Sequence, residues 1–171
     1  SANHLSKIGG GVALNLTRLR AQGEDIKGIE GVSGGVIGVS KMLEQSFNYF
    51  NQMGARPGAG AVYLSVFHPD FDTLMDTKKI NADETIRLKT LSLGAVIPDK
   101  FMELAEKNKT AYAFYPHSIY KKYGVNLDEI SMDEWYEKLA NDKDIRKKEI
   151  NPRKVLTKIA QMQQESGYPY V

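Results

Sequence analysis

Ala61-Val62-Tyr63-Leu64-Ser65-Val66-Phe67 gives the clearest indication of the fold class of this chain. The stretch is largely apolar and rich in β-branched and aromatic residues, which is typical of a buried strand. Buried strands of this kind occur mainly in parallel sheets whose faces are covered by helices. Such a strand predicts helices on both sides of it along the chain.

The segment before this strand, residues 33–51, has the spacing of an amphipathic helix. Its apolar residues recur at steps of three and four, and they are Val36, Val39, Leu43, Phe47 and Phe50. Three polar residues lie off this stripe: Lys41, Glu44 and Gln45. Ser33 is a candidate N-cap for this helix. A helix leading into a buried strand fits an α/β fold.

Strands and helices alternate along the rest of the chain. Short apolar runs predict strands at residues 11–16, 90–97 and 111–115, and helical spacing predicts helices at 69–78 and from Pro98 onward. The run Ser131-Met132-Asp133-Glu134 is typical of a capping box, and Asn151-Pro152 predicts the start of a last helix that ends at Gly167. We expect an α/β fold with parallel strands that alternate with helices. Residues 168–171 resemble the start of another strand, so we expect residues 1–171 to be one segment truncated at both ends.

Composition excludes several functional classes. The 171 residues include no cysteine, which excludes disulfides, cysteine-bound zinc, iron–sulfur clusters and thiol chemistry by this chain alone. A net charge of +2 gives little attraction to nucleic acid, and the basic run Arg146-Lys147-Lys148 is expected to be a solvated loop. No apolar run reaches the roughly 18 residues of a membrane span. The first residues lack an export signal, so we expect a cytoplasmic protein.

Two loops are unusual in length or in glycine content. Residues 17–28 form a long polar loop that includes Arg18, Arg20 and Lys27, which could together clamp a polyphosphate or could simply be a basic surface loop. Residues 52–60 contain three glycines and a proline, which end a helix and permit close approach of the backbone to a ligand. Gly9-Gly10-Gly11 precedes a strand, which favours a tight turn over a phosphate cradle, and residues 31–35 could be either an anion site or a helix entry.

Isolated polar residues indicate neither a metal site nor catalysis. His4, His68 and His117 lack the spacing of metal ligands. Asp70 and Asp72 are explained by the preference for carboxylates at a helix start. We therefore expect no metal site and no catalytic residue in this chain.

Taken together, several long motifs resemble the large subunit of class Ib ribonucleotide reductases. These motifs are residues 7–23 (KIGGGVALNLTRLRAQG), 51–61 (NQMGARPGAGA), 76–80 (DTKKI), 151–154 (NPRK) and 165–170 (ESGYPY). The resemblance covers essentially the whole chain. It implies a partial reductase-type α/β barrel, of which this chain would be part of the first half.

The resemblance also implies an activity and a set of site residues. Members of the family reduce ribonucleoside diphosphates to deoxyribonucleotides by cysteine radical chemistry, so this cysteine-free segment alone is expected to be inactive. Arg20 and Lys27 match positions that contact the triphosphate of an effector, and Gly10 and Gly11 match backbone beside the substrate. The second specificity loop, which reads the substrate, corresponds to Gln52, Met53, Gly54, Ala55, Arg56, Pro57 and Gly58. The family commonly carries glutamine on both sides of the loop arginine, where this chain has Ala55 and Pro57.

Partners and cofactors follow from the same resemblance. The effector would be a deoxynucleoside triphosphate or ATP, and a small subunit would supply a metal-tyrosyl radical. A glutaredoxin-like protein or thioredoxin would supply reducing equivalents, and the helix at 33–51 would form a homodimer. No nucleic-acid or membrane partner is expected. Two alternatives stay open at this point: a stand-alone nucleotide-binding module without catalysis, and one piece of a split reductase.

Overall fold

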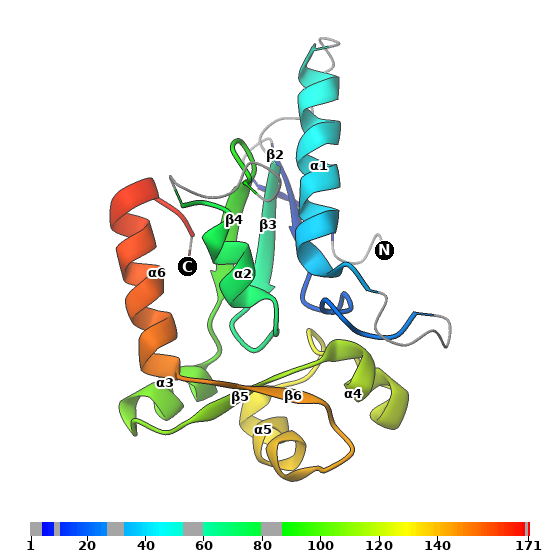
Figure 1. Cartoon of the computed structure of the whole chain (residues 1–171), viewed down its shortest axis with the longest axis vertical. Helices are drawn as coiled ribbons and strands as arrows, with labels where there is room; N and C mark the ends of the chain where they lie inside the picture. The colour runs from blue at the N-terminus through cyan, green and yellow to red at the C-terminus, as the bar shows by residue number, and fades with distance from the viewer. Residues whose placement is uncertain (1–4, 9–10, 27–32, 53–59, 80–86, 170) are drawn as a thin grey trace.

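The computed structural model describes residues 5–8, 11–26, 33–52, 60–79, 87–169 and 171. Figure 1 shows the arrangement of its strands and helices. In chain order they are β1 (Leu5–Ile8), β2 (Gly11–Asn15), α1 (Gly35–Gln52), β3 (Gly60–Ser65), α2 (Phe71–Asp76), β4 (Ser92–Val96), α3 (Asp99–Glu106), β5 (Ala111–Phe114), α4 (Pro116–Tyr123), α5 (Met132–Asn141), β6 (Lys147–Ile150) and α6 (Pro152–Ser166).

A four-stranded sheet in the order β1-β2-β3-β4 lies at the centre. β2, β3 and β4 are parallel, with Leu14 opposite Val62 and Tyr63 opposite Gly94. β1, which the sequence analysis missed, pairs with β2 in the antiparallel direction and places Ile8 opposite Gly11; the tight turn predicted at the glycines falls partly on residues 9–10, which lie outside the described residues. The predicted α/β class with parallel strands and intervening helices is confirmed, and the sheet does not close into a barrel within the described residues.

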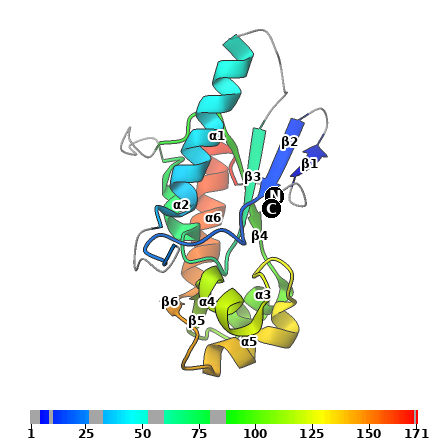
Figure 2. The ribbon, with the colours of Figure 1, turned by 90° about the vertical axis from the view of Figure 1, so that its right-hand side faces the viewer.

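Three helices lie against one face of this sheet. Figure 2 shows α1, α2 and α6 on the same side of β2, β3 and β4. The buried residues that α2 and α6 contribute to the core include Phe71, Leu74, Met75, Ile159 and Met162. The predicted stripe of α1 is partly wrong, because Val39 is exposed whereas Glu44 is only 6% exposed. α1 therefore packs through a face rotated toward Val36, Ser40 and Glu44.

A second layer packs below the sheet and contains α3, α4, α5 and a two-stranded ribbon. β5 pairs with β6 in the antiparallel direction, so β5 is not a strand of the parallel sheet. The expected solvated loop at Lys147 and Lys148 is wrong, because both residues belong to β6. Pro116 and His117 begin the helix α4, which the sequence analysis did not predict.

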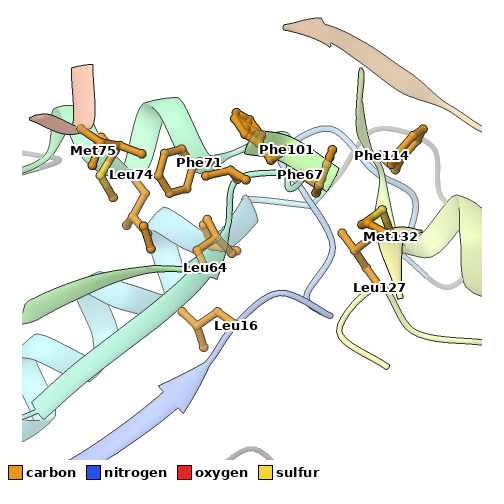
Figure 3. Packing of buried hydrophobic residues seen from close by; sticks show 14 of the residues in the cluster. Leu16, Leu64, Phe67, Phe71, Leu74, Met75, Phe101, Phe114, Leu127 and Met132 are labelled. Atoms are coloured by element: carbon orange, nitrogen blue, oxygen red, sulfur yellow. The ribbon is translucent and has the colours of Figure 1, made fainter. Parts of the chain in front are cut away.

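Phe67 joins the two layers. Its ring lies 5.4 Å from that of Phe101 and 5.6 Å from that of Tyr136, and its carbonyl accepts a 2.8 Å hydrogen bond from the Phe114 amide. Figure 3 shows Phe67 between Phe101 and Phe114 within the buried cluster. The core is therefore continuous between the sheet and the lower layer.

Three predicted helix ends can be compared with the structure. The Asn151 side chain accepts from the Lys154 amide at 3.3 Å, which confirms the predicted N-cap of α6. Gly167 closes α6 at a φ of 75°, in the left-handed region that favours glycine, and this prediction is also confirmed. The capping box at Ser131 is wrong, because the Ser131 side chain makes no capping hydrogen bond.

Two glycines on the central strands allow aromatic rings to approach the backbone. A Cβ atom on Gly94 would lie 2.2 Å from the Tyr63 ring, and one on Gly60 would lie 2.4 Å from the Phe47 ring. Phe47 thereby packs α1 directly over the start of β3. None of the described helices is long and apolar enough to cross a membrane.

Candidate functional site

The predicted polyphosphate loop connects the end of β2 to the start of α1. Its first arm, from Leu16 to Ile26, is described, whereas Lys27 and residues 28–32 lie outside the described residues. Arg20 is exposed on this arm. The loop therefore presents one of its two predicted effector residues within the part of the chain that can be assessed.

Arg18 lines the same small cavity as Arg20, but its guanidinium is held by acidic residues. Its guanidinium donates to both oxygens of Asp128 at 3.1 and 3.2 Å and to Glu129 at 2.9 Å. Both partners lie between α4 and α5. A bidentate arginine–carboxylate contact fixes orientation as well as charge. The guanidinium of Arg18 thereby ties the loop to the lower layer, and the clamp of three cations considered from sequence stays a prediction because Lys27 lies outside the described residues.

Arg20 lines a small cavity on the side of the loop that faces α4. The cavity has a volume of about 190 Å³, and its lining also includes His117 and Tyr120. Burial, followed by the positive charge of Arg20, lowers the pKa of His117. The imidazole is thereby favoured in its neutral form beside the arginine.

The two arms of the loop pair with each other at its base. The Gly23 amide donates to the Ser33 carbonyl, and the Ser33 amide donates to the Glu24 carbonyl, both at 2.9 Å. Arg146 adds a 3.0 Å hydrogen bond from its guanidinium to the Gly23 carbonyl while it lies over the Tyr115 ring. We call this paired segment, residues 22–24 with residue 33, the loop neck.

Glu24 fixes the neck to α4. Its buried carboxylate accepts from the Ala21 amide at 2.8 Å and from the His117 amide at 3.1 Å. His117 lies in the first turn of α4, where backbone amides have no partner within the helix. Burial raises the pKa of Glu24, and the backbone hydrogen bonds oppose that shift.

Asp70 and His68 fix the neck to the end of β3. The Asp70 carboxylate accepts from the Gln22 amide at 3.2 Å and from the Val36 amide at 3.0 Å. His68 accepts from the Asp70 amide through Nδ1 at 3.0 Å and contacts the Leu19 carbonyl through Nε2 at 2.8 Å. Asp70 and Asp72 lie at the start of α2, as the sequence indicated, but the Asp70 side chain accepts from the first turn of α1 and makes no capping hydrogen bond to α2.

A family model described as ribonucleotide reductase, barrel domain, matches residues 1–171. The chain belongs to this ribonucleotide reductase family. The ribonucleoside-diphosphate reductase subunit alpha of Bacillus subtilis is 56% identical over 167 residues, which make up 98% of this chain and 24% of that protein. The NrdEB subunit alpha of the same organism is 57% identical over 167 residues, or 98% of this chain and 15% of that protein.

A fungal relative extends the comparison. The ribonucleoside-diphosphate reductase large chain of Neurospora crassa is 33% identical over 169 residues, or 98% of this chain and 18% of that protein. The chain therefore spans about a quarter or less of the length of these ribonucleotide reductase relatives.

Two of the remaining predicted residues of this ribonucleotide reductase chain, Gln52 and Gly11, are described, and they lie at the far end of α1 and at the start of β2. Gln52, expected in the second loop, is the exposed last residue of α1. Residues 53–58, which include Arg56, lie outside the described residues, and so does Gly10. Gly11 is the first residue of β2. The structure does not bring Gln52 together with Arg20, because α1 separates them.

Sequence reasoning missed the residues that hold the loop in place. Glu24, His68, Asp70 and Arg146 all make contacts between segments distant in sequence, which a spacing pattern does not reveal. One signal was present, since His68-Pro69-Asp70 directly follows a buried strand, where polar residues commonly serve a site. Among the described residues, no group of three histidine, aspartate or glutamate side chains could hold a metal ion.

Proposed function

We propose that this chain is part of the large subunit of a ribonucleoside-diphosphate reductase and carries its effector loop and part of its substrate site. The match of the barrel-domain family to residues 1–171 is the observation that carries this proposal. The relatives, which are ribonucleoside-diphosphate reductase subunits, support the reaction, which reduces ribonucleoside diphosphates to deoxyribonucleotides. The chain has no cysteine, so the radical and reducing thiols would belong to other parts of the protein.

Arg20 and Lys27 would bind the triphosphate of a deoxynucleotide or ATP effector. An arginine suits this role because its planar guanidinium donates two parallel hydrogen bonds to phosphoryl oxygens. The exposure of Arg20 on a loop braced on both sides supports this assignment. The acidic partners of Arg18 suit it to hold the loop in place.

The segment 52–58 would read the substrate, with Arg56 reaching toward it and Gly10 and Gly11 providing backbone beside the sugar. Gln52 and Gly60 flank this segment at the end of α1 and the start of β3. The helix α1 has 18 residues, and a rise of 1.5 Å per residue makes it about 27 Å long. Effector loop and substrate loop of one chain would therefore lie at opposite ends of α1.

A homodimer through α1 would bring the two loops together. Two copies of α1 that pack in opposite directions place the first loop of one subunit beside the second loop of the other. The outer face of α1 supports such packing, because Met42 is 67% exposed and Tyr49 is 59% exposed. Exposed apolar side chains in a row mark an interaction surface.

The whole enzyme would need further components. A small subunit would supply a metal-tyrosyl radical, and a glutaredoxin-like protein or thioredoxin would return electrons to the large subunit. This chain would contribute nucleotide binding and positioning, which are the functions its loops can perform without cysteine.

The test is a pair of substitutions in the full-length large subunit that contains this chain. Arg20→Ala removes a charge-assisted contact with a net contribution of about 1.5 to 3 kcal/mol, so effector affinity should fall by roughly ten- to a hundred-and-fifty-fold. Arg56→Ala should instead reduce turnover even at saturating effector, because substrate positioning is lost. Equilibrium dialysis with labelled effector measures the first effect, and steady-state reduction measures the second.

Lys109→Ala provides a matched control, because it also removes an exposed positive charge but lies after α3. Its effector affinity should equal that of the wild type. If Arg20→Ala binds effector as tightly as the wild type while Arg56→Ala keeps full stimulated turnover, the loop assignments are wrong.

A further inference from the structure

We infer that Asp70 is a positioning residue for the effector loop: its carboxylate, with His68, holds both ends of the loop so that Arg20 is presented before any effector binds. This inference rests on the proposed function of Arg20. It adds to that function a group that would never touch the nucleotide.

The Asp70 carboxylate bridges two segments that are separate in sequence. It accepts from the Gln22 amide, two residues after Arg20, and from the Val36 amide in the first turn of α1. Asp70 is 7% exposed, and its side chain makes no capping bond to α2, which it precedes. One buried carboxylate therefore joins the outgoing and the returning arm of the loop.

Gly35 makes this close approach possible. It has a φ of +76°, and a Cβ atom there would lie 2.4 Å from Asp70 Oδ2 and 2.8 Å from the Gln22 nitrogen. A side chain at this position would be strained and would also displace the carboxylate. The junction of the three segments is therefore built around a glycine.

His68 holds the loop on the other side of Arg20. Its Nδ1 accepts from the Asp70 amide at 3.0 Å, so the ring proton is on Nε2, which donates to the Leu19 carbonyl at 2.8 Å. His68 is 1% exposed. The segment 68–70 thereby contacts the loop at Leu19 and at Gln22, immediately before and shortly after Arg20.

These contacts would increase effector affinity without contacting the effector. A loop that is already ordered loses less conformational entropy when a ligand binds. The same contacts could instead only stabilise the fold. The two roles differ in one measurable way. If Asp70 positions the loop, removing its contacts lowers effector affinity more than an equal loss of stability elsewhere in the protein does.

The test uses Asp70→Asn in the full-length large subunit, with dTTP as the probe in equilibrium dialysis. The amide keeps the shape but removes the charge and one acceptor, so dTTP should bind roughly ten- to a hundredfold more weakly. Turnover at saturating dTTP should recover. Asp72→Asn is the matched control, because Asp72 is exposed and pairs with Lys158 on α6, and its dTTP affinity should not change.

A second control separates positioning from stability. Leu104→Ala removes a buried side chain of α3, away from the loop, and lowers the thermal midpoint without touching the neck. The inference predicts normal dTTP affinity in this variant. If Asp70→Asn and Leu104→Ala lose dTTP affinity alike, or if Asp70→Asn binds dTTP like the wild type, Asp70 has no positioning role.

Amide hydrogen exchange on the wild-type protein keeps the inference testable if Asp70→Asn does not fold. The Gln22 and Val36 amides should be protected in the absence of dTTP, and exchange at the rate of unstructured peptide would overturn the inference. Failure of the proposed function looks different, because Arg20→Ala would then bind dTTP like the wild type while those two amides remain protected.

Discussion

At the scale of single residues, buried carboxylates that accept hydrogen bonds from backbone amides hold several loops of this structure in place. Glu24, Glu44 and Asp70 each accept two or more backbone amides from other segments of the chain or from the same loop. Hydrogen bonds to a charged acceptor are stronger than neutral ones, and they offset part of the cost of burying the charge. These residues therefore fix loop positions that apolar packing alone would leave undetermined.

His68 gives a pH-dependent prediction at the same scale. Burial lowers its pKa from the ordinary value of 6.5, and the neighbouring Asp70 charge opposes that shift. The unfolded chain therefore binds more protons than the folded chain between the two pKa values. As pH falls below about 6.5, the free energy of unfolding should fall by up to roughly 1.4 kcal/mol per pH unit from this group. His68→Gln should remove this part of the slope.

Urea unfolding between pH 7.5 and pH 5 can be followed through the single tryptophan, Trp135. It measures how the free energy of unfolding changes with pH in the wild type and in His68→Gln. The pH slopes of the two proteins must be compared, because Glu24 has a raised pKa and stabilises both proteins as pH falls, which partly hides the effect of His68 in either one alone. His117→Gln is the control, since that histidine is only half-buried and should change the slope less. Parallel pH profiles for the wild type and His68→Gln would contradict the prediction.

At the scale of elements, α1 is held by a contact of the charged residue Glu44, which the apolar spacing of the helix does not predict. Glu44 Oε2 accepts from the Thr90 amide at 2.8 Å and from the Leu91 amide at 3.0 Å, just before β4. The helix is thereby joined to the strand at the edge of the parallel sheet.

Glu44→Ala should leave both amides without a partner and lower the free energy of unfolding by about 2 to 4 kcal/mol. Gln45→Ala, at the next and exposed position of the same helix, should change it by less than about 0.5 kcal/mol. Urea denaturation of the two variants measures both values. Equal effects would mean that the Glu44 contact contributes nothing beyond helix propensity.

Most helices and strands of this structure could be predicted from the sequence, but some could not. Apolar periodicity predicted β2, β3, β4, α2, α3, α5 and α6, because each of these buries a face that its own residues define. For α1 it predicted the helix but only part of its buried face, because the charged Glu44 is buried by partners on another segment. It failed at β6, whose Lys147 and Lys148 are held by pairing with β5 and not by apolar packing. Long-range backbone pairing leaves no periodic signal in the strand itself.

The residues of the candidate site were also predicted only in part. Arg20 was identified because the family resemblance covers its loop, and its exposure agrees with a binding role. The residues that hold the loop were not predicted, since Asp70 and Gln22 are 48 positions apart and Arg146 lies further still from Gly23. Contacts across such separations depend on the folded arrangement of several elements at once.

At the scale of the whole molecule, the outer face of α1 presents exposed apolar side chains that could join two copies of the chain. Val39, Met42 and Tyr49 are exposed on a helix that packs against the sheet through its other face. We expect the chain to self-associate through this surface, because burying these side chains removes apolar area from water.

Met42→Glu should weaken self-association by at least about tenfold, since it places a charge in an apolar contact. Met102→Glu is the matched control, because Met102 is also exposed but lies on α3. Sedimentation over a range of concentrations distinguishes the variants. A wild-type chain that stays monomeric at high concentration, or equal weakening by both substitutions, would contradict an interface on α1.

The ring of Phe47 over Gly60 links variation in α1 to variation at the start of β3. Because a Cβ atom at residue 60 would overlap that ring, the two positions cannot change independently. In an alignment of many relatives, any alanine or serine at position 60 should be accompanied by a smaller residue at position 47. Covariation at this pair of positions would then show how closely α1 packs on the start of β3 in each group of relatives.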